Sequence, residues 1–419
     1  MNIEQLYKLY SQSYLADTDT RKIRKGSVFF ALKGANFNGN KFAADALKSG
    51  SSYVVIDEKE HSQHANFILV ENVLETLQQL ANFHRKQLNI PIISLSGSNG
   101  KTTTKELINA VLSKKLNTTA TIGNLNNHIG VPLTLLAMTP TTEIGIVEMG
   151  ANHIKEIEFL CGIAEPNFGF ITNFGKAHLE GFGSVEGIIE GKSELYNFLR
   201  NNNGIAFINE DDELQTKQSK GINSITFNKN FIQFIEANPF VKVQFNNTII
   251  ESQLIGKYNF NNIAVAIAIG NYFKVPIELI KNAIENYIPT NNRSQILEKG
   301  TSKIILDAYN ANPSSMQAAL ENFSQLKDLN KIVFLGDMFE LGNDSKKEHQ
   351  KIADLATSFN FSKVYLIGKA FSTTPVKNAF VYDSFEAFKT STENLNISNS
   401  TILIKGSRGM ALERILDLF

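Results

Sequence analysis

The sequence lacks a second cysteine, an excess of charge of either sign and any long apolar run. Because Cys161 is the only cysteine, no internal disulfide can form. Lysine plus arginine equals aspartate plus glutamate, at 41 each, so no overall field attracts nucleic acid or an anionic membrane. The longest apolar stretch, 263–269, is too short to span a bilayer, and residues 1–15 lack the basic and apolar regions of a secretion signal. We therefore expect a cytoplasmic protein that neither binds nucleic acid nor inserts in a membrane.

The length and composition predict a folded chain with several domains. At roughly 150 residues per domain, 419 residues suggest about three domains. Hydrophobic residues at 42% and charged residues at 20% are typical of a soluble globular protein. Short strand-like runs at 28–32, 53–57 and 67–70 predict a small N-terminal α/β domain over residues 1–90.

Residues 91–292 and 293–419 follow as two further predicted domains. In the central one, near-continuous apolar runs such as 144–149 indicate mainly parallel strands covered on both faces. In the last one, strand and helix alternate regularly, from KIILDAY at 303–309 to a final helix over 410–418. The predicted fold class is therefore α/β, with a small N-terminal domain, a central mainly parallel domain and a C-terminal Rossmann-like domain.

A tight loop with two glycines separates an apolar run from a helical one in SLSGSNGKTTTKEL, residues 94–107. This order is typical of a phosphate-binding loop, in which main-chain N–H groups and the helix N-terminus face an anion. The lysine would reach the β- and γ-phosphates, and the first threonine hydroxyl would bind Mg²⁺. The general pattern needs a glycine where this chain has Leu95, and a glycine-rich turn with a helix cap is the alternative. The ATP-binding residues predicted in the loop are Gly97, Ser98, Asn99, Gly100, Lys101, Thr102 and Thr103.

Two polar side chains stand at or after the ends of two strand candidates. Glu148 lies in the run at 144–149 and His178 follows the run at 168–172. Both are expected at the carboxyl edge of the sheet, where ligands of open α/β sheets collect. Mg²⁺ prefers carboxylate, hydroxyl and phosphate oxygens, which suits Thr102 and Glu148, whereas histidine is a less usual ligand. A solvated strand end and a structural histidine are the alternatives.

Eight segments resemble, in this order along the chain, the motifs of the Mur ligase family: GSNGKTTTKE, GNLNNHIGVPLTLL, EMGANHIKEI, ITNFGKAHLEGFGSVEGIIEGKSEL, GKYNFNNIAVAIA, DAYNANPSSMQAAL, LGDMFELG and KGSRGMALE. The N-terminal segment DTRKIRKGSVFFALKGANFNGNKF is similar to the family's uridine-nucleotide segment. The resemblance thus covers nearly the whole chain. Two residues depart from the usual pattern: Tyr258 stands where many members have histidine, and Ser98 where threonine is common.

The resemblance implies ATP-dependent amide ligation. It is strongest to the members that join D-alanyl-D-alanine to UDP-N-acetylmuramoyl-tripeptide in peptidoglycan synthesis. In that reaction the γ-phosphate of ATP passes to a substrate carboxylate, and the incoming amine attacks the acyl phosphate. Lys101, two Mg²⁺ ions and the helix dipole would offset the repulsion between the negative groups. In family terms Thr102 and Glu148 hold one ion, while Glu148 and His178 help to hold the other.

Lys192, in EGKSEL, is by resemblance a carbamylated lysine. An ammonium beside Mg²⁺ and His178 would be repelled, whereas a carbamate offers an anionic oxygen. A solvated lysine on a helix is the alternative. The predicted catalytic residues are Lys101, Glu148, His178 and Lys192, and the predicted metal ligands are Thr102, Glu148, His178 and Lys192.

The rest of the nucleotide site is assigned by resemblance and by spacing. Asn259 and Asn262 lie one turn apart at a helix start, where their amides would address adenine, although helix capping is the alternative. From the C-terminal domain, Arg293 would reach the phosphates and Asp307 the ribose. A nucleotide held by two domains predicts open and closed forms of the molecule.

Substrate residues are assigned in the same way, with polar loops and turns as the alternative. Arginine or lysine would meet the pyrophosphate of the UDP group, and Phe37 would stack on uracil. The family suggests a monomer. Asn310 and Asn312 would bind the dipeptide, with Ser407 and Arg408 completing that pocket, and Asn126 and Asn127 stay open between the substrate side and the adenine side. The predicted substrate-binding residues are Thr20, Arg21, Lys33, Gly34, Asn36 and Phe37 for the UDP group, and Asn126, Asn127, Asn310, Asn312, Ser407 and Arg408 for the other parts of the substrates.

Rival functions differ in the motifs that they require. Other Mur ligases and folylpolyglutamate synthetases share the phosphate loop, but ALKGANFNGNKF and DAYNANPSSM distinguish this chain from them. A nucleotide-dependent switch predicts a guanine-reading N-K-x-D motif or an arginine-rich subunit interface. The sequence indicates neither, since NKNF at 228–231 lacks the aspartate. No pocket can be assigned to the third residue of the tripeptide, so meso-diaminopimelate and lysine both stay open.

Overall fold

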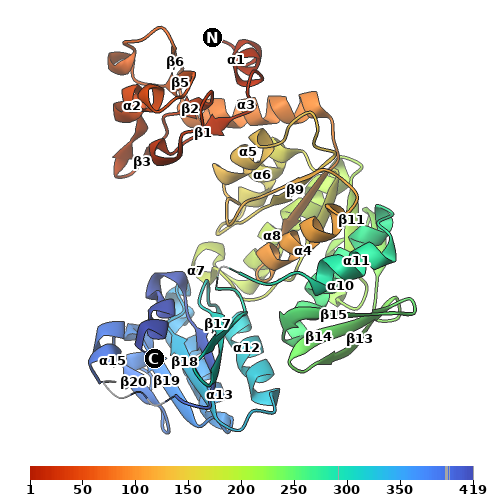
Figure 1. The fold of residues 1–419 in the computed structure, drawn as a ribbon, viewed down its shortest axis with the longest axis vertical. Coiled ribbons are helices and arrows are strands. Elements are labelled where there is room, and N and C mark those ends of the chain that lie inside the picture. The colour runs from red at the N-terminus through yellow and green to blue at the C-terminus, as the bar shows by residue number, and fades with distance from the viewer. Residues whose placement is uncertain (291, 392–394, 396, 419) are drawn as a thin grey trace.

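The computed structural model describes residues 1–290, 292–391, 395 and 397–418, which form three α/β units in a row (Figure 1). The N-terminal unit lies at one end, the central unit in the middle and the C-terminal unit at the other end. This architecture confirms the predicted α/β fold class. Within the described residues, no helix has the length and apolarity needed to cross a membrane.

The N-terminal unit is a parallel sheet with order β1-β2-β5-β6 and short helical segments around it. Helix α3 leads from it into the central unit: Asn72 caps its start by accepting from the Glu75 N–H, and Asn89 ends it in a left-handed conformation. Its elements are α1 Ile3–Tyr10, β1 Ala16–Asp17, η1 Thr20–Lys22, β2 Val28–Phe30, β3 Lys33–Gly34, β4 Phe37–Asn38, η2 Gly39–Phe42, α2 Ala43–Lys48, β5 Tyr53–Ile56, η3 Lys59–His61, β6 Phe67–Leu69 and α3 Val73–Leu88.

The central unit contains a six-stranded parallel sheet with order β12-β11-β10-β7-β9-β8. Strand β7 lies between β10 and β9, so the loops that follow these three strands meet at one edge, as expected at a switch point of an open sheet. Its elements are β7 Ile92–Ser96, α4 Lys101–Leu112, β8 Thr118–Ala120, α5 Gly130–Leu136, β9 Ile144–Glu148, α6 Glu156–Ala164, β10 Phe168–Ile171, α7 Leu179–Phe182, α8 Val185–Asn201, β11 Ile205–Asn209, α9 Glu213–Gln218, β12 Asn223–Phe227, η4 Lys257–Asn259, α10 Phe260–Tyr272 and α11 Ile277–Glu285.

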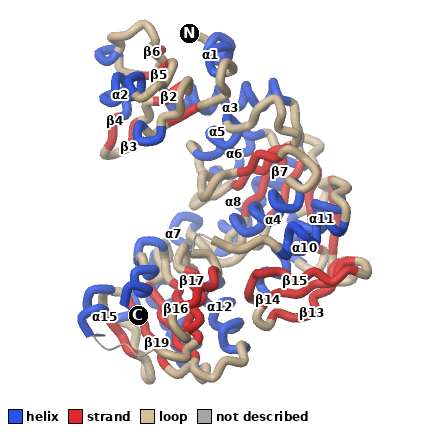
Figure 2. Tube along the Cα trace, in the orientation of Figure 1, coloured by secondary structure: helices blue, strands red, loops and turns tan. Residues whose placement is uncertain are grey.

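A separate antiparallel sheet, which the sequence analysis did not predict, lies beside α10 and α11 (Figure 2). It consists of β13 Ile232–Ala237, β14 Phe240–Phe245 and β15 Thr248–Ile255. Along β14 buried and partly exposed residues alternate, because only one face packs on the core.

The C-terminal unit has a six-stranded sheet with order β16-β17-β21-β18-β19-β20, parallel except for β16. The predicted final helix over 410–418 is wrong as an α-helix: two 3₁₀ segments stand there, separated by Ala411 in a left-handed conformation. Leu412 and Ile415 are buried at a spacing of three, which suits a 3₁₀ turn. The elements are β16 Gln295–Lys299, β17 Ser302–Asp307, α12 Pro313–Gln325, β18 Lys331–Gly336, η5 Gly342–Asp344, α13 Ser345–Ser358, β19 Lys363–Ile367, α14 Lys369–Ser372, β20 Phe380–Tyr382, α15 Phe385–Ser391, β21 Thr401–Lys405, η6 Arg408–Met410 and η7 Leu412–Leu418.

Candidate active site

The loop between β7 and α4 has the backbone of a phosphate-binding loop. Gly97 has a φ of 135°, and a Cβ there would clash with Thr172 Oγ1, so only glycine fits. Gly100 is left-handed and directly precedes α4. The loop is tied to the end of β10, because Ser98 N donates to Asn173 O at 3.0 Å and Asn99 N to Asn173 Oδ1 at 3.2 Å. The N-terminus of α4 is thereby presented at the carboxyl edge of the sheet, where it favours an anion.

Lys101 folds back over this loop. Its Nζ donates to Gly97 O at 2.6 Å. Burial lowers the pKa of the Lys101 ammonium; Glu148 opposes this shift, and Arg293 of the C-terminal unit adds to it. A phosphate group would offer this ammonium a stronger acceptor than the carbonyl that it now contacts.

The Glu148 carboxylate at the end of β9 has a donor set that fits Mg²⁺. The side chain is buried, and its Oε1 accepts from Thr102 Oγ1 at 3.2 Å and from Asn126 Nδ2 at 2.8 Å. Its Oε2 has no hydrogen-bond partner among the residues that the structure describes. A buried carboxylate oxygen without a partner, next to a hydroxyl, is costly unless a cation or ligand satisfies it.

His178 connects the central unit to the C-terminal one. It follows β10, directly precedes α7 and has a left-handed backbone with φ of 54°. Its Nδ1 forms an ion pair with Glu340, and this contact lowers the pKa of the Glu340 carboxyl.

Lys192 lies on α8 and is completely buried. Its Nζ donates to Ala151 O at 2.9 Å and lies 4.8 Å from the centre of the Phe182 ring. Burial holds the pKa of Lys192 well below its ordinary value, and the charge of Lys101 lowers it further. This environment excludes the alternative of a solvated helix lysine.

One cavity of about 1110 Å³ extends between the central and C-terminal units. Of the predicted site residues, it brings together Ser98, Asn99, Gly100, Lys101, Thr102, Thr103, Asn126, Asn127, Glu148, His178, Asn259, Asn262, Arg293, Asp307 and Asn310. Lys192 is not part of the described lining, but its Nζ donates to the carbonyl oxygen of Ala151, which is. The phosphate loop therefore faces a space bounded by two units.

Asn259 and Asn262 brace the start of α10 against the helix after the phosphate loop. Thr104 Oγ1 donates to Asn262 Oδ1 at 3.0 Å, and Asn262 Nδ2 donates to Asn259 Oδ1 at 2.8 Å. Asn259 Nδ2 donates to Ile255 O at 2.8 Å, so its amide does not serve as a helix cap. Their role toward adenine stays a prediction.

Tyr309 and Lys405, which were not among the predicted site residues, line the side of the cavity formed by the C-terminal unit. The Arg293 guanidinium lies 3.7 Å from the centre of the Tyr309 ring, and Lys405 Nζ forms a 2.6 Å ion pair with Asp307 Oδ2. Asp307 Oδ1 also accepts from Ser294 N at 3.2 Å. Lys405 ends the apolar run TILIK, and a lysine at the end of a buried strand could have predicted the ion pair with Asp307.

Tyr309 is expected to hold Arg293 ready for a nucleotide phosphate. Because an aromatic ring stabilises a nearby guanidinium by about 0.5–2 kcal/mol, Tyr309→Leu should raise the dissociation constant for ADP by about 2- to 30-fold. Tyr309→Phe keeps the ring and should bind within about twofold of the unmodified protein. Isothermal titration with ADP measures both; equal losses in the two variants would assign the effect to the hydroxyl instead.

The other predicted residues of the C-terminal unit mainly organise the chain. Asn312 caps α12, and its Nδ2 donates to Asn99 Oδ1 across the units at 2.7 Å. Ser407 is buried and accepts from Phe339 N at 2.9 Å. Arg408 is exposed and pairs with Glu413 at 2.9 Å. None of Asn312, Ser407 and Arg408 belongs to the lining that the structure describes for the cavity.

The predicted UDP-binding residues lie on the N-terminal unit, apart from this cavity. The Arg21 guanidinium pairs with Asp19 at 2.8 Å, and Lys33 Nζ lies 3.0 Å from Asp57 Oδ1. On the β3–β4 hairpin, Phe37 is 51% exposed and stacks on Phe42 with ring centres 5.4 Å apart. Thr20 lies in η1, and Gly34 and Asn36 belong to the exposed hairpin. These charges and rings are accessible to a ligand, and their role stays a prediction.

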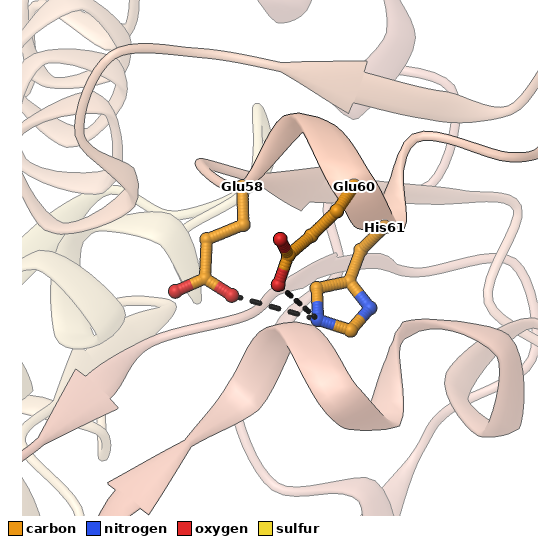
Figure 3. Close-up of side chains that lie close together, drawn as sticks. All are labelled: Glu58, Glu60 and His61. Carbon is orange, nitrogen blue, oxygen red and sulfur yellow. Dashed lines mark ion pairs between the residues drawn. The ribbon is translucent and has the colours of Figure 1, made fainter.

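Among the residues that the structure describes, one three-membered group of carboxylates and imidazole has the spacing of a metal site, and it lies elsewhere: Glu58, Glu60 and His61 (Figure 3). His61 Nε2 is 3.5 Å from Glu58 Oε2 and 3.8 Å from Glu60 Oε1. Glu58 already accepts from Asn38 at 3.0 Å. The predicted Mg²⁺ site instead combines one carboxylate with a hydroxyl and an imidazole, so phosphate and carbamate oxygens would have to complete it.

Comparisons with known proteins show the family of this chain. Three family models match in order: "Mur ligase family, catalytic domain" at residues 15–94, "Mur ligase middle domain" at 95–270 and "Mur ligase, glutamate ligase domain" at 292–408. A relative from Bacillus subtilis is 35% identical over 95% of this chain and 91% of its own length. The chain therefore belongs to the Mur ligase family.

Within that family, this chain is similar to ligases of one named type. The Bacillus subtilis relative is named UDP-N-acetylmuramoyl-tripeptide–D-alanyl-D-alanine ligase. The crystal structure of MurF from Acinetobacter baumannii matches with a TM-score of 0.85 at 28% identity, covering 99% of this chain and 98% of that one. MurF from Thermotoga maritima in complex with ADP matches with a TM-score of 0.83 at 27% identity, covering 97% and 96%.

Proposed function

We propose that this chain joins D-alanyl-D-alanine to UDP-N-acetylmuramoyl-tripeptide at the expense of ATP, giving UDP-N-acetylmuramoyl-pentapeptide, ADP and phosphate. The observation that carries the proposal is the phosphate loop, facing the unpartnered Glu148 oxygen in a cavity that two units share. Full-length similarity to relatives named for this reaction supports it over a switch or a folylpolyglutamate synthetase. We further propose a cytoplasmic monomer, with domain limits at 1–90, 91–292 and 293–419.

The residues of the cavity suit a reaction that first transfers a phosphoryl group. The tripeptide carboxylate attacks the γ-phosphorus of ATP, the bond to the bridging oxygen breaks, and ADP leaves. The amine of D-alanyl-D-alanine then attacks the acyl carbon, loses a proton and expels phosphate. Lys101, Arg293 and the α4 N-terminus stabilise the negative charge that gathers around both steps.

The donor set beside the phosphate loop fits Mg²⁺. Thr102 and Glu148 would hold one ion, and Glu148 with His178 would help to hold a second. A bound Mg²⁺ supplies positive charge that offsets the repulsion between the phosphates and the attacking carboxylate. Asn126 and Thr121 keep the carboxylate in place, since Asn126 Nδ2 donates to Glu148 Oε1 and Glu148 N donates to Thr121 Oγ1 at 3.0 Å.

Lys192 is proposed to be carbamylated. A neutral amine attacks CO₂, forms an N–C bond and releases a proton, and burial keeps Lys192 neutral over a wider pH range than an exposed lysine. The product is an anion in place of a cation, which also removes the repulsion between Lys192 and Lys101.

The substrates are proposed to bind along the rest of the molecule. The UDP group would lie on the N-terminal unit at Thr20, Arg21, Lys33, Gly34, Asn36 and Phe37. The other parts of the substrates, among them D-alanyl-D-alanine, would contact Asn126, Asn127, Asn310, Asn312, Ser407 and Arg408. Adenine and ribose would meet Asn259, Asn262 and Asp307, with Arg293 on the phosphates.

The decisive assay supplies the purified protein with ATP, Mg²⁺, D-alanyl-D-alanine and either of two UDP-tripeptides, ending in meso-diaminopimelate or in lysine at the third position. Mass spectrometry of the product shows which is extended. Phosphate release should need both the UDP-tripeptide and the dipeptide. Release that is independent of both would contradict ligation and favour a nucleotide switch.

A further inference from the structure

The loop after β18 in the C-terminal unit reaches across to the candidate active site. Glu340 on this loop forms the ion pair with His178 Nδ1, and Glu340 O accepts from Glu180 N at 3.1 Å. Gly342 lies close beside Glu180, where an added Cβ would meet the Glu180 Cβ at 3.4 Å. Side chain and backbone of one loop therefore contact His178 and Glu180, at the start of α7.

Both members of the ion pair have a backbone conformation that disfavours side chains. The φ angle is 60° at Glu340 and 54° at His178. Such a conformation is unfavourable for a residue other than glycine, because the Cβ comes too close to the backbone. It persists where the surrounding structure fixes it, which is common at functional sites.

The three residues before Glu340 explain how the loop is fixed. The Asp337 carboxylate accepts from Ala370 N at 2.9 Å and from Phe371 N at 3.0 Å. Met338 N donates to His349 Nε2 at 3.0 Å, and Phe339 N donates to the Ser407 hydroxyl at 2.9 Å. These hydrogen bonds fix the backbone before Glu340, so the Glu340 carboxylate is held beside His178.

A carboxylate beside Nδ1 also decides the proton position on the imidazole. No other group of the described residues offers His178 Nδ1 a hydrogen-bond partner. An ionised carboxylate only accepts hydrogen bonds, so the contact with Glu340 favours a hydrogen on Nδ1. When the ring is neutral, its lone pair then lies on Nε2, at the opposite edge. Carboxylates that orient a functional histidine in this way commonly support metal ligands and proton acceptors.

We propose that Glu340 is a positioning residue for the ligase reaction: it holds His178 in the Nδ1–H tautomer, so the reaction centre is complete only when the C-terminal unit is docked. The role of His178 in the reaction rests on the function proposed above. The contact itself links the chemistry to the arrangement of the two units.

Three variants separate positioning from docking. Glu340→Ala should lower kcat by about 10- to 100-fold while the KM for ATP changes by about twofold or less. Glu340→Gln keeps an oxygen acceptor for Nδ1–H and should restore most of the rate. Lys176→Met removes a different ion pair across the same interface, 3.4 Å from Glu348 Oε1, and should leave kcat unchanged. Equal losses in Glu340→Ala and Lys176→Met would overturn positioning and leave docking as the whole role.

Nitrogen NMR of histidine-labelled protein tests the contact without any reaction. The His178 signals, assigned by their loss in His178→Gln, should show a protonated Nδ1 in the unmodified chain and a changed tautomer ratio in Glu340→Ala. An unchanged ratio would overturn the proposal. If the unmodified chain made no pentapeptide, the proposed function would fail while this spectrum still tested the pair.

Discussion

Lys192→Gln removes nearly all ligase activity and leaves the fold intact, whereas Lys192→Glu restores part of the activity. We expect this because the proposed role is that of an anionic oxygen donor, which glutamate can imitate at shorter reach and glutamine cannot. The loss should exceed about 100-fold, since even residues that only support metal ligands cost 10- to 100-fold. Product formation measured by mass spectrometry gives the rates, and circular dichroism with thermal melting checks the fold.

A direct signal for the carbamate comes from ¹³C-labelled bicarbonate. The unmodified chain should show a carbamate carbon resonance that is missing in Lys192→Gln. Near-normal turnover in Lys192→Gln, or the same resonance in both proteins, would remove the carbamate from the mechanism and leave Lys192 as a buried structural amine.

The unmodified lysine also predicts a pH dependence of stability in CO₂-free buffer. Burial holds the pKa of Lys192 well below 10.5 in the folded chain, whereas the unfolded chain returns to about that value. Between the two values the unfolded chain binds more protons, so the free energy of unfolding rises with pH. Relative to Lys192→Met, the unmodified chain should gain stability as the pH rises toward 10.5. Urea unfolding at several pH values measures the difference, and a constant difference would contradict burial of the neutral amine.

The sequence predicts the architecture where the signal is local. Gly97 and Gly100 have positive φ angles and follow the completely buried strand β7, so the phosphate loop could be placed from spacing alone. The antiparallel sheet of β13, β14 and β15 was not predicted. Its strands carry charges such as Lys242 and Glu251 on the exposed face, and half-buried strands with charged faces give a weak signal.

Local sequence pattern predicted the candidate site only on the central unit, whereas Arg293, Asp307 and Asn310 of the C-terminal unit were assigned by family resemblance. Glu148 and Lys101 follow from strand ends and loop geometry, whereas Tyr309, Lys405 and Glu340 acquire meaning from partners on other elements or on another unit. Nothing in a single sequence says that a residue near 340 will meet a residue near 178. Such pairs depend on how units dock, which is decided by long-range packing rather than by local pattern.

Glu148→Gln should abolish the contribution of Mg²⁺ to nucleotide binding while leaving binding of the free nucleotide in place. The amide oxygen of glutamine can still accept from Thr102 and Asn126, so the strand end keeps its hydrogen bonds and loses only the charge. With the carboxylate charge gone, ligase activity should fall by about 100-fold or more, comparable to losing a key electrostatic group in other active sites. Thermal melting with ADP alone and with ADP plus Mg²⁺ separates the two effects. The extra stabilisation given by Mg²⁺ should appear in the unmodified chain and be absent in Glu148→Gln.

Glu143→Gln provides the matched control, because Glu143 lies just before the other end of β9 and is exposed. Its Oε2 accepts from Asn117 N at 2.7 Å, so the variant tests loss of a carboxylate charge beside the same strand but far from the phosphate loop. We expect Mg²⁺ to stabilise the ADP complex of Glu143→Gln as it does that of the unmodified chain. If Mg²⁺ still stabilised Glu148→Gln to the same extent, the cation would have to be held by other groups. Glu148 Oε2 would then have no role in binding Mg²⁺.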